Sequence, residues 1–515
     1  MLKMNSLVNA VIEFNHLDSN QIDQLYNPKE YKISSHTLFD QAEEIVLSHI
    51  KKNNKIIICG DYDADGICST TILYRTLKKL NADVGYYIPN RFKEGYGLND
   101  NTVDLALKKG YELFILVDNG VSADSSLVKI KEAGKKCIIL DHHSYEGDVL
   151  CDCLVHPNLL DEDYHDMCGS GLALNLAERL IGYDPFNVSL AGIATIADLM
   201  PLWGFNRSLV TRSVSEINNH QAQVFMNLLN SSKSISETDI AFQLVPKLNA
   251  IGRLADVIDV NQVVKYLCLD NIGSIDAFSK EIIRVNEMRK EINQRMYVKA
   301  LEMLSNENVI VLYDESFHEG IVGITAGRLA SELKKPVFVL NKEGNRLKGS
   351  GRSFGSIDLR DLVSPANHLL NRFGGHSQAA GLELDISNVN TFIQLVNENK
   401  EALIQHSVDH QFLDMKHEWL DLDVFNELLN YGPFGQGFQI PSFRFNEFEI
   451  KGSRIIRGGI SFDLSIYNMN ISAVYFQSIL DERLILSNFS SFIGRVTLDE
   501  FRGQRKLKIM IESFE

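Results

Sequence analysis

The chain has 515 residues, enough for three or four domains at about 150 residues per domain. Apolar residues make up 45% of it and charged residues 23%, a mixture that excludes a wholly disordered protein. Asp and Glu outnumber Lys and Arg by 67 to 51, which gives a formal net charge of −16. That balance argues against a protein coated in nucleic acid but allows a localised basic groove.

The sequence shows no pattern for membrane insertion or export. Its apolar runs are shorter than the about 18 residues that a spanning helix needs, so no membrane partner is expected. The N-terminal residues lack the basic region, apolar core and cleavage site of a secretion signal. The 7 cysteines are odd in number and form no CxxC motif, which favours a reducing, cytoplasmic location.

The first half of the chain alternates short β-branched runs with amphipathic helical patterns. Strands are expected over residues 55–59, 83–89, 113–118 and 136–141, and helices over residues 67–80 and 125–134. This alternation predicts right-handed βαβ units and a mostly parallel sheet, so the fold class is α/β. Beyond residue 187 the pattern is helical, and the charged stretch 274–305 predicts a long helix between two lobes.

The second half begins with another α/β region and ends in strands. A strand is expected over residues 308–315, a helix over 324–335, a strand over 336–341 and a helix over 362–373, followed by a polar linker at 405–418. From residue 441 onward, strand-like runs alternate with turns. Their regular spacing predicts a small β-barrel.

Three carboxylates follow the first predicted strand. Asp61, Asp63 and Asp65 take alternate positions of GDYDADG, so an extended backbone would turn all three to one side. Such a cluster of like charges is costly unless a cation lies among them. An EF-hand is excluded because Ile72 replaces the required Glu and a strand leads into the motif. By itself, the motif leaves a solvated acidic turn as an open alternative.

Similar side chains follow two other predicted strands and end one apolar stretch. They are Asp118 with Asn119, Asp141 with His142 and His143, and Asp198. The carboxyl ends of parallel strands share one ligand-binding edge of a sheet. A lone buried carboxylate such as Asp198 must be paired or bound to a metal. Four separate segments are therefore predicted to converge on one acidic cluster.

The composition of this cluster indicates which metal and which chemistry it would support. Oxygen ligands with imidazole, and no cysteine in the core set, favour Mn²⁺ or Mg²⁺ over structural zinc. The charge is sufficient for two ions. Two such ions stabilise the attacking and leaving oxygens of an in-line displacement at phosphorus, so phosphoester hydrolysis is predicted.

The second lobe offers side chains that can bind phosphate. KGSGRSFGS combines glycines, which let backbone N–H groups approach an anion, with Arg352, which can bind phosphate in a bidentate way. FGGHSQAAG offers His376, although a plain Gly-rich turn stays open. A serine-hydrolase elbow is disfavoured because the segment before it is predicted to be helical. Arg91 and Arg253 are weaker phosphate-contact candidates, because a solvated face explains them equally well.

Two further clusters give weaker signals. A zinc site or ordinary loop residues would explain Cys151, Cys153, His156, His165 and Cys168. The last β region carries Arg495, Arg502, Arg505, Lys506 and Lys508, interleaved with Phe492 and Phe501. A barrel face of cations and aromatics can stack bases and follow a nucleic-acid backbone, but nearby acids dilute this patch.

The motifs resemble those of a known superfamily. GDYDADG, VDNG, DHH and ATIADLMPL match, in order, four motifs of the DHH phosphoesterases, and GSGRS and FGGHSQAAG match their companion DHHA1 domain. Within the superfamily the chain most resembles the RecJ family of single-strand-specific DNA exonucleases. The segments that carry this closer resemblance are YYIPNRFKEGYGL, LNAIGRL, HEGIVGITAGRLA and YGPFGQGFQIPSF.

The resemblance implies a domain order and a set of site residues. The domains would be a DHH catalytic domain with a helical C-terminal part at 1–270, a connecting helix at 271–305, a DHHA1 substrate-binding domain at 306–404 and an OB-like nucleic-acid-binding domain at 405–515. The implied metal ligands are Asp61, Asp63, Asp65, Asp118, His142 and Asp198, and the catalytic residues are Asp118, His142 and His143. Substrate would be bound by Arg352, His376, Ser350, Ser353, Arg91, Arg253 and His318.

The function implied by the resemblance is metal-dependent hydrolysis of single-stranded DNA in the 5′-to-3′ direction, with a role in DNA repair and recombination. Single-stranded DNA is then the expected partner, and a single-strand-binding protein or a helicase is a candidate protein partner. Two alternatives stay open: a DHH phosphodiesterase for short RNA oligonucleotides or cyclic dinucleotides, and a non-catalytic DNA-binding scaffold. The C-terminal β region favours long strands, and the full ligand set favours an enzyme.

Overall fold

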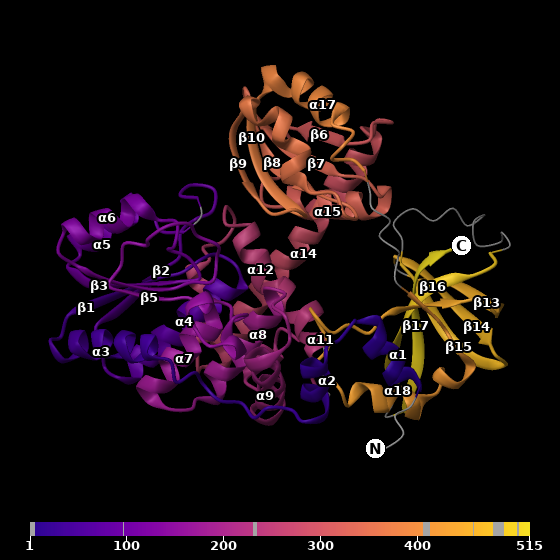
Figure 1. The fold of residues 1–515 in the computed structure, drawn as a ribbon, viewed down its shortest axis with the longest axis horizontal. Coiled ribbons are helices and arrows are strands. Elements are labelled where there is room, and N and C mark those ends of the chain that lie inside the picture. The colour runs from indigo at the N-terminus through magenta and orange to yellow at the C-terminus, as the bar shows by residue number, and fades with distance from the viewer. Residues whose placement is uncertain are drawn as a thin grey trace.

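The computed structural model describes residues 6–95, 97–229, 234–404, 412–456, 458–476, 489–501 and 504–515. A parallel-sheet lobe leads through helices into one long helix, which carries a mixed-sheet lobe, and a β lobe follows at the C-terminal end (Figure 1). Within the described ranges, no helix is both long enough and apolar enough to cross a membrane.

The first lobe is built on five parallel strands in the order β2-β1-β3-β4-β5. They are β1 (Lys55–Cys59), β2 (Val84–Tyr87), β3 (Tyr111–Val117), β4 (Lys136–Leu140) and β5 (Cys153–Val155). Neighbouring β1 residues face opposite layers: Ile58 packs with α3 (Thr37–Lys51), α4 (Ala64–Lys79) and α7 (Gly169–Ile181), and Ile57 with α5 (Asp100–Lys108) and α6 (Asp124–Glu132). Each fully buried aliphatic side chain contributes about 1.5–3 kcal/mol. The predicted α/β fold class is therefore confirmed.

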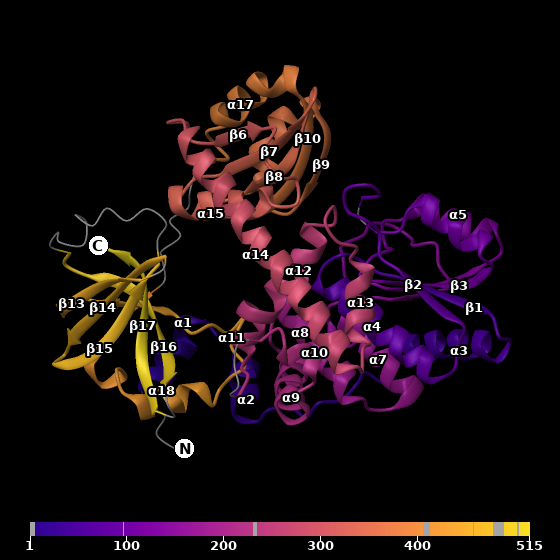
Figure 2. The same ribbon diagram turned by 180° about the vertical axis from the view of Figure 1, so that it is seen from behind.

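A helical region follows the parallel sheet and ends in the long connecting helix. Its elements are α8 (Pro185–Ala197), α9 (Gly204–His220), α10 (Gln223–Met226), α11 (Glu237–Asp239), a π-helical turn (Ile240–Leu244), α12 (Val245–Arg253), α13 (Asn261–Leu267) and α14 (Ile272–Glu302). Asn271 caps α14 by accepting the N–H of Ser274 at 2.9 Å. Figure 2 shows α14 rising from beside α12 to the lobe that contains α15 (Val322–Leu333). The long helix predicted over 274–305 is confirmed.

The second lobe is a mixed five-stranded sheet in the order β6-β7-β8-β10-β9. Its strands are β6 (Ile310–Asp314), β7 (Val337–Glu343), β8 (Arg346–Arg352), β9 (Leu370–Gly375) and β10 (Ala379–Asp385), accompanied by α15, α16 (Leu359–Val363) and α17 (Val389–Glu398). The helix predicted over 362–373 is only partly confirmed: α16 and the 3₁₀ helix Ser364–Leu369 cover its first part, but residues 370–373 belong to β9. Strand β9 pairs with β10, and Phe373 lies opposite Leu382. This pairing stabilises a strand in a segment whose local sequence favours a helix.

The C-terminal lobe is a seven-stranded sheet in the order β11-β12-β16-β17-β15-β14-β13. Its strands are β11 (Phe412–Asp414), β12 (Ser442–Phe445), β13 (Phe448–Ile456), β14 (Gly459–Ile466), β15 (Met469–Tyr475), β16 (Phe492–Phe501) and β17 (Gln504–Phe514), with α18 (Leu422–Leu429) before β12. The strand-rich C-terminal region predicted from residue 441 is thus present. Of the predicted linker, residues 405–411 lie outside the described residues, and β11 occupies part of the rest.

The first two helices pack against this C-terminal lobe. They are α1 (Ser6–Phe14) and α2 (Ser19–Tyr26), and Figure 2 shows α1 close to α18. Leu7, Val11 and Leu25 share an apolar core with Phe443, and Trp419 donates its indole N–H to the Ser6 hydroxyl at 2.7 Å. The predicted first domain at 1–270 includes these helices, but they close the core of the C-terminal lobe.

Arg207 joins the helical region to the segment that leads into the C-terminal sheet. Its buried guanidinium on α9 donates to the carbonyl oxygens of Tyr431 at 2.5 Å, Gly432 at 3.0 Å and Pro433 at 3.3 Å. Burial lowers the pKa of Arg207 to about 10, while the charge of Glu237 acts in the opposite direction. The side chain stays charged at neutral pH and satisfies three carbonyls at once.

We expect Arg207→Met to lower the unfolding free energy by about 2–3 kcal/mol, because three carbonyls lose their charged donor. The measurement is the melting temperature of the full chain, together with limited proteolysis between α18 and β12. Arg284→Met is the matched control, since Arg284 is exposed on α14 and, among the described residues, forms its ion pair with Glu281 in its own helix. Equal melting temperatures for both variants would show that the hydrogen bonds of Arg207 to the three carbonyls do not stabilise the protein.

Candidate metal centre

The loop after β1 turns directly into α4. Asp63 caps this helix by accepting the N–H groups of Asp65 and Gly66, both at 3.0 Å. Asp65 therefore lies in the first helical turn, so the backbone is not extended through all three acids. A side chain at Gly66 would not fit, since its Cβ would lie 2.3 Å from the carbonyl oxygen of Asp61. This close approach brings Asp61 and Asp63 together beside the sheet.

The N-terminus of α7 holds Asp65. Its carboxylate accepts the N–H groups of Gly169 and Ser170, each at 2.7 Å, and the Ser170 hydroxyl donates to the Asp65 carbonyl at 3.0 Å. The positive end of the helix dipole stabilises this negative charge. Gly169 also allows a tight fit, because a Cβ there would lie 2.7 Å from the Cβ of Asp118. The helix thus fixes Asp65 next to Asp118.

Asp118 follows β3 in the left-handed backbone region, with a φ of 59°. Asn119 supports this conformation by donating its amide to the carbonyls of Val117 at 2.8 Å and Cys59 at 3.1 Å. The Asn119 side chain also accepts the N–H of Leu98 at 3.3 Å. Asn119 thereby ties the ends of β1 and β3 together, a role that its place in VDNG did not by itself reveal.

Asp141 organises the loop after β4. Its carboxylate accepts the N–H groups of Val121 at 3.1 Å, His142 at 2.8 Å and His143 at 3.2 Å, and it lies 2.8 Å from Nδ1 of His143. Burial acts to raise the pKa of Asp141, but the hydrogen bond and charge of His143 lower it overall. Asp141 is thus an ionised carboxylate whose hydrogen bonds fix the backbone of both histidines and the ring of His143.

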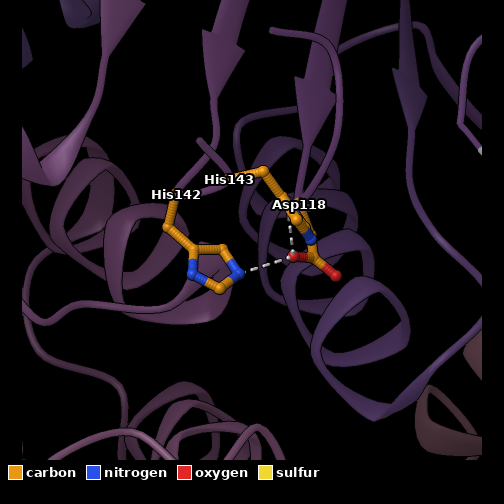
Figure 3. A group of neighbouring side chains, drawn as sticks. All are labelled: Asp118, His142 and His143. Carbon is orange, nitrogen blue, oxygen red and sulfur yellow. Dashed lines mark hydrogen bonds and ion pairs between the residues drawn. The ribbon is translucent and has the colours of Figure 1, made fainter. Parts of the chain in front are cut away.

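The predicted ligands converge around His142. Its Nε2 lies 3.2 Å from Asp118, 3.4 Å from Asp198 and 3.8 Å from Asp65, measured to carboxylate oxygens. Figure 3 shows His142 and His143 beside Asp118. Donor atoms lie within 4.8 Å of one another in three groups: Asp61 with Asp63 and Asp118, Asp65 with His142 and Asp198, and Asp118 with both histidines. Asp118 is common to two of them, so the structure brings all six predicted ligands together.

Crowding makes these carboxylates hard to ionise without a cation. Burial, followed by the charge of neighbouring acids, raises the pKa of Asp61, Asp63 and Asp118, and raises that of Asp198 to about 8. The Oδ1 atom of Asp61 is buried and has no hydrogen-bond partner among the described residues. Burial also lowers the pKa of His142, which keeps its ring in the neutral form that binds metals. The donor set therefore fits hard divalent cations.

His143 has the opposite electrostatic character. Burial acts to lower its pKa, but the hydrogen bond and charge of Asp141, with the charges of Asp198 and Asp61, raise it to about 9. Its side chain is 42% exposed, and Nδ1 lies 4.0 Å from Asp118. A protonated imidazole thus stands at the open rim of the acidic cluster, where it can donate a hydrogen bond to an anion.

Four arginines lie close to one another, and two of them, Arg91 and Arg253, adjoin the carboxylates. Arg253 on α12 has its pKa lowered to about 10 by burial and by the charges of Arg91, Arg289 and Arg352. The charge of Asp63 acts on Arg253, and that of Arg91 acts on Asp61, so the basic and acidic groups are neighbours. Arg289 on α14 is absent from the sequence prediction, and its Nε is buried without a partner in the part of the chain described. Clustered cations of this kind favour a polyanionic ligand.

Comparisons with known proteins decide the family. The N-terminal domain of the DHH family matches residues 55–200, the DHHA1 domain matches 306–402 and the RecJ OB domain matches 413–513. The single-stranded-DNA-specific exonuclease RecJ of Salmonella typhimurium is 31% identical, over 92% of this chain and 89% of that protein. The chain belongs to the RecJ family. The Thermus thermophilus exonuclease is 32% identical over 78% of this chain and 60% of its own length.

Solved structures agree with this assignment. A RecJ from Thermus thermophilus in complex with Mn²⁺ matches with a TM-score of 0.79 at 24% identity, covering 99% of this chain and 78% of that one. An exonuclease RecJ bound to manganese matches with a TM-score of 0.62 at 30% identity, covering 71% of this chain and 94% of that one. The likeness confirms the RecJ fold, with the OB-type β lobe after the DHHA1 lobe.

The other substrate-binding residues predicted from the RecJ resemblance lie in the mixed-sheet lobe. Ser350 and Arg352 face the start of α15, where a Cβ on Gly323 would lie 3.0 Å from Arg352 Nη2 and 3.3 Å from Ser350 Oγ. The Ser353 hydroxyl donates to the carbonyl of Ile357, so it holds its own loop. Ser350 is therefore better placed than Ser353 to meet a ligand beside Arg352.

The two histidines of this lobe differ in their surroundings. His318 lies 3.4 Å from Asp256 of the helical region and accepts the N–H of Gly320 on Nδ1 at 3.1 Å. It is thereby engaged at the contact between two lobes. His376 is exposed in the turn after β9, and its backbone N–H donates to the carbonyl of Ala379 at 2.8 Å. For the described residues, no contact of His376 with the acidic cluster is recorded.

The cysteine and histidine cluster is dispersed among separate partners. The thiol of Cys153 bonds the Leu38 carbonyl at 3.5 Å, Cys168 lies 3.7 Å from the Thr195 hydroxyl, and His165 bonds the Leu160 carbonyl at 2.8 Å. The metal-binding groups found in the described ranges contain no cysteine. The structure therefore favours ordinary loop residues over a zinc site here.

The aromatic and basic face expected in the last β region differs from the structure at Phe492. Phe492 is fully buried and stacks on Phe445 with ring centroids 4.6 Å apart, so its predicted contact with bases is wrong. Phe492 lies on the face of β16 that packs into the core. The alternation of apolar and polar residues alone did not show which face of β16 is buried. Arg495 pairs with Glu512 at 2.6 Å. Arg502 and the side chain of Phe501 lie outside the described part of the structure.

We expect Mn²⁺ to raise the melting temperature of the protein, because binding at about 100 times Kd adds about 2.7 kcal/mol. Asp118→Asn should raise the melting temperature of the metal-free protein, since it removes one of several crowded charges, and should abolish most of the Mn²⁺-induced increase. Asn tolerates the left-handed backbone at this position. Differential scanning fluorimetry with EDTA or Mn²⁺ measures both effects.

Asp83→Asn is the control, because Asp83 is exposed before β2 and away from the cluster. An equal Mn²⁺-induced increase in both variants would show that Asp118 does not belong to the metal centre.

Proposed function

We propose that the chain is a metal-dependent exonuclease that hydrolyses single-stranded DNA. The observation that carries the proposal is the meeting of six candidate ligand side chains, Asp118 and His142 among them, in a RecJ-family chain. Relatives named single-stranded-DNA-specific exonuclease support the substrate. RecJ structures in complex with Mn²⁺ and with Mg²⁺ support the ions.

Two ions can share the cluster. One would be held by Asp61, Asp63 and Asp118, and the other by Asp118, His142, Asp198 and the remaining lone pairs of Asp65. When bound, the ions polarise a phosphodiester and lower the pKa of a bound water, which makes hydroxide available near neutral pH. The oxygen-rich set with one neutral imidazole suits Mn²⁺ or Mg²⁺.

The residues around the cluster complete the site. Protonated His143 at the rim donates a hydrogen bond to the scissile phosphate or the leaving oxygen. Arg91, Arg253, Arg289 and Arg352 neutralise neighbouring phosphates and hold the strand in register with the carboxylates. Their sequence-independent contacts with the backbone suit an enzyme that degrades strands of any sequence.

The resemblance extends the proposal beyond the chemistry. It supports 5′-to-3′ digestion, a role in DNA repair and recombination, and a single-strand-binding protein or a helicase as a partner. The cysteine pattern supports action in the cytoplasm. The C-terminal β lobe, which adds to the two catalytic lobes, favours long strands over short RNA oligonucleotides or cyclic dinucleotides.

We expect the purified chain with Mn²⁺ to release nucleotides from end-labelled single-stranded DNA and to spare blunt duplex DNA. Asp118→Asn should reduce the rate about 1,000-fold or more, because the loss of a shared ligand removes several kcal/mol of stabilisation. Single-strand binding should stay within about threefold, since the arginines are intact. Label at the 5′ end should be released before label at the 3′ end.

Asp83→Asn serves again as the control and should have the wild-type rate. Equal digestion of blunt duplex DNA, or a near-normal rate for Asp118→Asn, would contradict the proposed function.

The role of Arg289 can be tested separately from catalysis. In the Asp118→Asn background, Arg289→Gln should weaken binding of a single strand about tenfold and lower the slope of log Kd against log salt by about 0.7–0.9, the value for one phosphate contact. Arg284→Gln on the same helix is the matched control and should change neither quantity. An unchanged salt slope for Arg289→Gln would show that Arg289 does not bind the strand.

A further inference from the structure

His156 is a buried imidazole that the chemistry above does not use. It directly follows β5, and 2% of the residue is exposed. Strands β4 and β5 pair in parallel with Leu140 opposite Val155, and the N–H of Asp141 donates to the Val155 carbonyl at 3.3 Å. This register places His156 next to Asp141, at the sheet edge that carries the candidate metal centre.

Two hydrogen bonds fix the tautomer of His156. The backbone N–H of Asn158 donates to Nδ1 at 3.2 Å, so Nδ1 must offer a lone pair. The proton of the neutral ring therefore lies on Nε2. Nε2 lies 3.1 Å from the backbone carbonyl oxygen of His143. The imidazole thus donates to that carbonyl.

Tyr145 restricts the ring further. The centroids of Tyr145 and His156 lie 5.0 Å apart with an interplanar angle of 70°, an edge-to-face contact. Enclosure by Tyr145 and the Nδ1 hydrogen bond leave the imidazole one orientation. Its Nε2–H therefore points in a fixed direction.

We infer that His156 is a positioning residue that holds His143 in place for hydrolysis of the phosphodiester. Asp141 binds the N–H and the ring Nδ1 of His143, and His156 binds its carbonyl oxygen. The backbone of His143 is thus held on both sides, and its imidazole meets the substrate without a conformational search. This inference rests on the proposed function, because the effect of His156 on His143 is measured through the rate of hydrolysis.

A purely structural role accounts for only one of the two hydrogen bonds of the His156 ring. Nδ1 of His156 caps the short 3₁₀ turn at Pro157–Leu159, and a serine hydroxyl could satisfy the same N–H. The imidazole supplies a second polar atom, farther from the backbone, and this atom bonds His143. The two atoms can therefore be tested separately.

The test compares His156→Ser, which keeps a cap acceptor but loses the donor, with His156→Gln, whose amide N–H reaches as far as Nε2 but which loses the cap acceptor. We expect His156→Ser to lower kcat about 10–100-fold, the usual effect of losing a group that orients an active-site residue. KM for single-stranded DNA should change by less than about threefold, since the strand is bound elsewhere. His156→Gln should recover at least about tenfold of the kcat that His156→Ser loses.

Two measurements separate positioning from folding. In a His143→Ala background, His156→Ser should cause no further loss of kcat, because the two residues act through one another. In the metal-free wild-type protein, ¹⁵N NMR of histidine should show the proton of His156 on Nε2. If His156→Ser fails to fold, His156→Leu, which refills the space, takes its place in the comparison.

Equal kcat for His156→Ser and His156→Gln, additive losses with His143→Ala, or a proton on Nδ1 would each overturn this role. A wild-type chain without exonuclease activity would instead overturn the proposed function. An active wild type with an unaffected His156→Ser would overturn the positioning role alone.

Discussion

The structure depends on the repulsion among buried carboxylates at the carboxyl edge of one parallel sheet. Asp61, Asp63, Asp118 and Asp198 all have raised pKa values because burial and mutual charge oppose their ionisation. Such an arrangement is unfavourable unless cations bind within it. The cluster is therefore best understood as a protein framework for divalent ions, whose binding energy offsets the cost of assembling the acids.

Much of the surrounding architecture holds these charges in place. The N-terminus of α7 binds Asp65, the amide of Asn119 joins two strand ends, and Asp141 aims both histidines. Arg91 and Arg253 lie beside the acids, and Arg289 of α14 and Arg352 of β8 extend this positive charge around Arg253. A negative cluster beside a positive one suits a substrate that must both coordinate metal and neutralise cations, and a phosphodiester does both.

The sequence was sufficient to predict the parallel sheet, the long helix and the convergence of the six candidate ligands, because strand ends and motif order determine them. It did not show how the ligands are held. The cap made by Asp63 starts α4 earlier than the apolar pattern indicates. The strand nature of β9 and the burial of Phe492 depend on pairing and packing with distant segments. Arg289 was missed because an arginine on a charged helix has no local signature, and only the fold brings it to Arg253.

The most direct test of the account is electron paramagnetic resonance of the wild-type chain titrated with Mn²⁺. The account predicts two ions per chain with a spin-coupled spectrum, because ions that share Asp118 lie about 3.5–4 Å apart. Asp118→Asn should lose the coupled signal. A single uncoupled ion at saturation, or coupling that survives in Asp118→Asn, would contradict a two-ion centre built on this residue.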